Sequence, residues 1–262
     1  LGAVIAFAAS PAIQELLYMQ LIDLSVVAWV AATYWALLAS DRFKKWIPSL
    51  AFGALFAIGM LHKWSFFSYM IPAYLSGLTA LSERQSRLQV LAAAGLALAG
   101  FAPWYYVHMP VLIPRLFQAA SDFAVPVTRG WAVLAYFMIS ADTLGPFFWA
   151  LGWVAMSVPN YRVKEERSWL IWTWVLTSYL FWAIVPNRQI RFLLPGLSGL
   201  AVALCGAWPT PLIWCLSVVQ LFGALNYATG WISPVSVPAP LHAITFLLSH
   251  PAANEDWHIA DI

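Results

Sequence analysis

The chain has 262 residues, of which 62% are hydrophobic and only 9% are charged, with a formal net charge of +2. A soluble globular protein carries about 25% charged residues, so these few charges cannot cover a water-facing surface. The net charge is also too small to indicate nucleic-acid binding. The composition therefore predicts an all-α, polytopic membrane protein with most of its surface in lipid.

Apolar runs separated by short polar loops predict about seven to eight membrane-spanning helices. A helix needs about 20 apolar residues to cross a bilayer. In chain order the main runs are Ile22–Ser40, Ile47–Leu61, Trp64–Leu81, Leu88–Val107, Leu144–Val158, Trp169–Val185, Phe192–Ala207 and Leu212–Tyr227. Together they predict a transmembrane helix bundle.

Two segments depart from the simple succession of spans. Leu112–Val125 is predicted to lie along the membrane interface as an amphipathic helix. Trp208–Pro211 is predicted to break a helix, because proline lacks the backbone N–H and clashes with the preceding turn. We assign residues 1–240 to the transmembrane domain and 241–262 to the start of an extracytoplasmic segment.

The positions of lysine and arginine predict the orientation. Three loops, Asp41–Lys45, Ser82–Arg87 and Tyr161–Ser168, hold eight of the 13 basic residues. Cytoplasmic loops carry the excess of basic residues, so we assign these loops to the cytoplasm and leave the opposite orientation as the alternative. The expected location is the cell membrane, as a multi-pass protein of a bacterial inner or plasma membrane.

Four ionisable residues on the predicted outer side stand out, because a charge near hydrocarbon is costly and is a functional hypothesis by default. They are Asp23, Lys63, Arg188 and Arg191. One lysine and two arginines suit a phosphate group, which arginine contacts in a bidentate way. A nearby carboxylate would orient a hydroxyl, bind a divalent cation or hold the basic groups in place. The alternative is that these basic side chains only extend to the lipid headgroups.

Four stretches in chain order resemble the motifs of one enzyme family. They are Glu15–Asp23, Gly59–Trp64, Ala102–Tyr105 and Asn187–Pro195. The series resembles the GT-C superfamily of membrane glycosyltransferases, specifically the family 39-like branch with the protein mannosyltransferases and the aminoarabinose transferase of lipid A. The sequence departs from the pattern at His62, where threonine is commoner, and at Phe192, which replaces tyrosine.

The resemblance implies a transferase that takes a sugar from a polyprenyl-phosphate donor at the extracytoplasmic face. Lys63, Arg188 and Arg191 would bind the donor phosphate, and Asp23 would support the same cavity. The family's catalytic base lies in the first outer loop, which would precede Leu1. We therefore expect an N-terminally truncated, inactive piece of the enzyme. The implied partners are the donor and membrane lipids, and a divalent cation is the one cofactor left open.

Two other functions compete with the enzyme. A transporter or flippase for a lipid-linked or anionic solute would also show basic residues at the outer face. Such proteins often place ionisable groups near mid-membrane and contain paired repeats, whereas the charges here are at span ends and no second half is visible. A structural or assembly subunit would tolerate glutamine at Lys63, Arg188 and Arg191.

Overall fold

The computed structural model describes residues 1–10, 13, 23–122, 134, 137, 140–141, 144–158, 165–185 and 192–229. Within these residues every regular element is a helix, which confirms the all-α prediction. The helices are α1 (Gly2–Ala8), α3 (Asp23–Ala39), α4 (Trp46–His62), α5 (Phe66–Tyr69), α6 (Ile71–Ser82), α7 (Arg84–Asp122), α9 (Pro146–Ser157), α10 (Glu165–Ile184), α11 (Leu194–Ala207) and α12 (Thr210–Thr229). The segment 241–262 lies outside the described residues.

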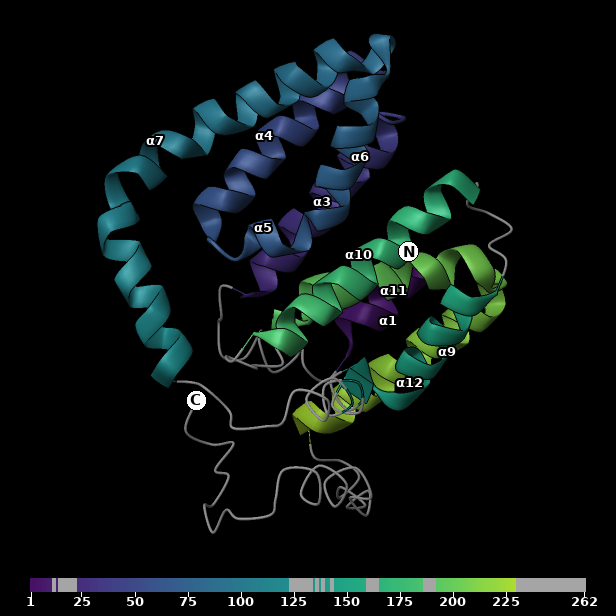
Figure 1. Ribbon diagram of the computed structural model, residues 1–262. Helices are drawn as coiled ribbons and strands as arrows, with labels where there is room; N and C mark the ends of the chain where they lie inside the picture. Colours follow the sequence, from purple (N-terminus) through teal and green to yellow (C-terminus); the bar gives the residue numbers. More distant parts are fainter. Residues whose placement is uncertain are drawn as a thin grey trace.

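The helices form two groups that meet at α10 and α11. Figure 1 shows α3 to α7 on one side and α1 with α9 to α12 on the other. Helix α11 packs against α10, α9, α3 and α1, and most of its residues between Leu194 and Gly206 are buried. It is therefore the central helix of the core.

Small residues allow neighbouring helices to approach closely. On the α4–α7 contact, a Cβ atom added to Gly53 would clash with the backbone of Ala93, and one added to Gly100 would lie 2.7 Å from the Cβ of Ala57. Between α10 and α11, a Cβ on Gly196 would clash with Ser178. Contacts built from glycine, alanine and serine are typical of helix pairs in membranes.

The distribution of side chains also suits an apolar surrounding. Polar side chains such as Thr33, Ser178 and Gln220 are buried between helices. Large apolar side chains are exposed instead, including Ile47 at 82% and Val218 at 64%. Exposed apolar side chains, where they form large patches, mark surfaces that contact a membrane or another protein.

One described helix is long and apolar enough to cross a membrane by length and composition, over Arg84–Arg115 of α7. The other apolar helices of the described residues are shorter; α9, for example, has 12 residues, which corresponds to about 18 Å. The hydrocarbon core of a bilayer is about 30 Å thick. The structure thus shows one such helix and six shorter apolar ones, fewer candidate spans than the sequence predicts.

The predicted span Trp64–Leu81 is wrong as a single helix. It consists of the short helix α5 and the separate helix α6, which begins at Ile71. Pro72 occupies the first turn of α6, where the missing N–H is not needed and the fixed φ angle favours a helix start. The segment before Phe66 is left as a turn, and this turn carries Lys63.

The helix that contains the predicted span Leu88–Val107 does not end at Val107. Helix α7 continues to Asp122, with Pro103, Pro110 and Pro114 inside it. Figure 1 shows α7 running along α4 and then bending away from it, as expected for a helix interrupted by prolines. The predicted break near Trp208 is confirmed, since α11 ends at Ala207 and α12 begins at Thr210.

Candidate functional site

The start of α3 and the end of α4 meet at one end of the bundle. The hydroxyl of Ser25 and the Nε2 atom of His62 form a hydrogen bond. Asp23 is the first residue of α3, two positions before Ser25, and Lys63 directly follows His62. The backbones of Asp23 and Lys63 therefore lie at the same end, while the side chain of Asp23 is outside the described part.

A tight turn positions Lys63. Its own N–H donates to the carbonyl oxygen of Gly59 (3.0 Å), and its carbonyl accepts from the N–H of Phe66 (3.0 Å). The ring of Phe66 is fully buried and lies so close to Gly59 that an added Cβ would be 2.5 Å from it. Glycine at position 59 is thus required by the close approach of an aromatic ring.

The side chain of Lys63 lies over the ring of Phe192. Its Nζ atom is 4.8 Å from the ring centroid, within the range of a cation–π interaction. The same ring stacks on Trp182, with centroids 4.5 Å apart and planes 29° apart. A cation–π interaction such as that between Lys63 and Phe192 stabilises by about 0.5–1 kcal/mol at an exposed site and by about 2 kcal/mol when desolvated. The cation–π interaction with Lys63 needs only an aromatic ring, so phenylalanine at position 192 can make it as well as the tyrosine of the resembled motif.

Two tyrosine hydroxyls fix the backbone beneath Lys63. The hydroxyl of Tyr69 donates to the carbonyl oxygen of Phe192 (2.7 Å), and the hydroxyl of Tyr34 donates to the carbonyl oxygen of Tyr69 (2.7 Å). Tyr34 in turn stacks on Trp174, with centroids 4.1 Å apart. This chain of contacts joins α3, α5 and α10 to the residue under Lys63.

The two predicted arginines, Arg188 and Arg191, lie outside the described residues. Arg191 immediately precedes Phe192 in the sequence, so the residue in contact with Lys63 is its direct neighbour. Of the predicted site, the structure therefore places the backbone of Asp23 and the whole of Lys63. The sequence did not single out Tyr34, Tyr69 or Trp182, which hold this end together.

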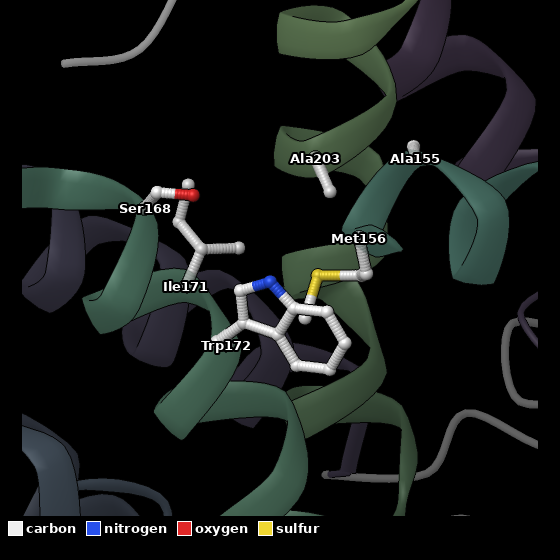
Figure 2. Close-up of a pocket in the computed structure, with 6 residues that line it drawn as sticks. All are labelled: Ala155, Met156, Ser168, Ile171, Trp172 and Ala203. Carbon is white, nitrogen blue, oxygen red and sulfur yellow. The ribbon is translucent and has the colours of Figure 1, made fainter. Parts of the chain in front are cut away.

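A depression in the surface at another place is too small for a ligand. It lies between α9, α10 and α11 and is lined by Ala155, Met156, Ser168, Ile171, Trp172 and Ala203. Figure 2 shows the indole of Trp172 lying between Met156 and the side chains of Ser168 and Ile171. The walls leave no room for a water molecule, so this depression is not a substrate site.

A metal site is not formed by the part of the chain that the structure describes. No three histidine, cysteine, aspartate or glutamate side chains gather there. The divalent cation considered from the sequence would need Asp23, whose side chain is not described. The sequence left such a cation open, and the described residues do not test it.

Comparison with protein-family models, curated proteins and solved structures found no match to this chain. The resemblance to GT-C glycosyltransferases therefore stays a prediction from the four sequence stretches.

Proposed function

We propose that this protein is a membrane glycosyltransferase that moves a sugar from a polyprenyl-phosphate donor to an acceptor at the extracytoplasmic face. The contact between Lys63 and Phe192 is the observation that carries the proposal. It joins the turn after α4 to the residue that follows Arg191. A lysine together with arginine is a combination suited to binding a phosphate.

The surroundings of Lys63 support a role in phosphate binding. Lys63 is half-buried, its ammonium group lies over the ring of Phe192, and that ring stacks on Trp182. A charge in such a low-dielectric place interacts more strongly with a phosphate than it would in water. The aromatic ring of Phe192 attracts the ammonium group through its quadrupole.

The chemistry of the proposed reaction matches this arrangement. An inverting transfer breaks the bond between the sugar and the phosphate, so negative charge develops on the departing phosphate. Cations placed beforehand stabilise that charge, and a base removes the proton of the acceptor. Lys63, Arg188 and Arg191 fill the first role in our proposal, with Asp23 as a supporting carboxylate. The base is not assigned to any residue of this sequence.

We further propose that the bundle lies in the membrane with seven to eight spans. Exposed apolar side chains on α7 and α12, including Val107, Val218 and Phe222, support this placement. Close helix contacts through glycine and alanine support it as well. The short helix α11 is enclosed by other helices, so it need not match the full thickness of the hydrocarbon.

A transfer assay tests the function. Membranes containing the intact protein are supplied with a radiolabelled polyprenyl-phosphate sugar, and label transferred to an acceptor is measured. Lys63→Gln and Arg191→Gln should each lower transfer about 100-fold or more, as loss of a charge-stabilising group does in other enzymes. Arg115→Gln is the control, because it also removes one positive charge, from an exposed side chain of α7.

Two results would contradict the proposal. If Lys63→Gln and Arg191→Gln both transfer sugar at the rate of the unchanged protein, the basic residues do not bind the donor. If the unchanged protein moves the lipid-linked sugar across the membrane and forms no transfer product, the protein is a transporter or flippase.

A further inference from the structure

The loops after α3 and after α6 form one basic surface at the end of the bundle opposite Lys63. Lys44 and Glu83 join the two loops through an ion pair, with Nζ and Oε2 3.9 Å apart. We call this the basic end surface; its exposed cationic side chains are Arg42, Lys44, Lys45, Arg84 and Arg87. It lies at the far end because α4 and α6 each run the length of the group between it and the turn of Lys63.

The loop after α3 has an unusual backbone. Asp41, Arg42 and Phe43 all have positive φ angles, of 51°, 58° and 62°. This left-handed conformation is unfavourable for residues other than glycine, and three in a row are held only by their surroundings. The hydroxyl of Ser40 accepts a hydrogen bond from the N–H of Phe43 (3.1 Å) and donates one to the carbonyl oxygen of Leu37 (2.6 Å).

Burial of Phe43 is the second contact that holds the loop. The side chain is 2% exposed and meets the ring of Phe52 edge to face, with centroids 5.4 Å apart. Its neighbours Arg42 and Lys44 are exposed. The left-handed turn therefore places one aromatic ring in the core and the adjacent cationic side chains on the surface.

The charges of the two loops do not cancel. Five basic residues face two acidic ones, Asp41 and Glu83. Glu83 is engaged by Lys44, and Arg87 donates through its Nε atom to the carbonyl oxygen of Leu81 (2.9 Å). The excess positive charge is thus spread over the three arginines and Lys45.

Exposed apolar side chains directly border these cations. Trp46, Ile47 and Leu88 are 45%, 82% and 62% exposed; Trp46 and Ile47 follow Lys45 at the start of α4, and Leu88 follows Arg87 near the start of α7. Tryptophan with lysine and arginine is the combination found at lipid headgroup level. A binding partner made of a polar anion alone would leave Ile47 and Leu88 in water.

We propose that the basic end surface binds the headgroups of anionic lipids, with Trp46, Ile47 and Leu88 reaching the apolar part of the same leaflet. Basic residues beside a membrane attract such headgroups electrostatically, and the attraction falls with salt. The inference relies on the membrane placement proposed above, and it does not depend on sugar transfer. Failure of the transfer assay would leave it standing.

Thermal unfolding of the purified full chain in a neutral detergent tests the proposal. Added phosphatidylglycerol should raise the midpoint by about 5 °C, because a ligand that binds only the folded state stabilises it, and phosphatidylcholine should not raise it. The variant Arg42→Gln/Lys45→Gln/Arg84→Gln should lose the shift, whereas Arg115→Gln should keep it. Soluble glycerol 3-phosphate should have no effect, because it lacks the apolar chains.

An equal shift with phosphatidylcholine, an equal shift with glycerol 3-phosphate, or a full shift in the triple variant would overturn the proposal. If the triple variant does not fold, the midpoints of the unchanged protein with the two lipids, with glycerol 3-phosphate and at high salt still test the proposal. Raising the salt concentration to about 0.5 M should remove the shift caused by phosphatidylglycerol, since exposed charges are screened at that ionic strength. A shift that persists at high salt overturns the proposal.

Discussion

The Nζ atom of Lys63 lies 4.8 Å from the centre of the Phe192 ring, although the two residues belong to opposite halves of the sequence. Lys63 follows α4 in the first helical group, and Phe192 precedes α11 in the second. The contact therefore joins the two groups at the end of the bundle where α3 begins. It also connects two of the stretches that resemble a glycosyltransferase.

Removal of the Phe192 ring should destabilise this end. Phe192→Leu deletes the surface under Lys63 and the stacking on Trp182, so we expect the free energy of unfolding to fall by about 1–3 kcal/mol. Phe117→Leu is the matched control, because Phe117 is exposed on α7, and it should change the value by less than about 0.5 kcal/mol. Denaturant unfolding in detergent measures both. Equal effects of the two variants would contradict the role of the ring.

Loss of the Tyr69 hydroxyl should leave the carbonyl of Phe192 without its hydrogen bond. Tyr69→Phe keeps the ring, so the expected loss of about 1–2 kcal/mol reports the buried hydrogen bond alone. Tyr106→Phe changes the same atom on a side chain that is 87% exposed and should have almost no effect. Unfolding curves of the two variants in the same detergent check this. A Tyr69→Phe protein as stable as the Tyr106→Phe protein would contradict the account.

The hydroxyl chain should act as a unit. In a double-mutant cycle, the cost of Tyr34→Phe and Tyr69→Phe together should differ from the sum of the two single changes by about 0.5 kcal/mol or more, because the hydroxyl of Tyr34 donates to the backbone carbonyl of Tyr69 and a shift of that backbone alters both hydrogen bonds. The free energies of unfolding of the four proteins give the coupling. Strict additivity would show that the two hydroxyls work independently.

A methyl group at position 59 should disturb the turn of Lys63. Gly59→Ala places a Cβ against the buried ring of Phe66, and we expect a loss of about 1–3 kcal/mol. Gly95→Ala is the matched control in α7, where an added Cβ meets nothing within 4 Å. It should be neutral or stabilising by up to about 1 kcal/mol, because alanine favours a helix. If both variants lower the thermal midpoint alike, the close approach of Phe66 is not the cause.

Much of the helical map was predictable from the sequence. Apolar runs bounded by charged loops located α3, α4, α10 and α12 to within a few residues, because both the runs and the loops reflect local composition. The wrong helix boundaries are those that local composition does not mark. Aromatic and apolar residues continue from Trp64 to Leu81, so the break before α6 was hidden. The apolar run that ends at Val107 did not reveal that α7 continues to Asp122.

The site was predictable in part. Lys63 was found because a lysine between two apolar runs is conspicuous in any membrane sequence. Tyr69 was not found, since its partner is a backbone carbonyl, and every residue carries one. A buried tyrosine hydroxyl demands an acceptor, but a single sequence does not say which distant residue provides it.

Direct binding of a polyprenyl phosphate to the purified protein is the measurement that tests the central claim most directly. The unchanged protein and Arg115→Gln should bind it with the same dissociation constant, and Lys63→Gln should bind it at least about tenfold more weakly, a loss of about 1.4 kcal/mol. If Lys63→Gln binds the polyprenyl phosphate as tightly as the unchanged protein, Lys63 does not contact the phosphate, and the proposed site is wrong.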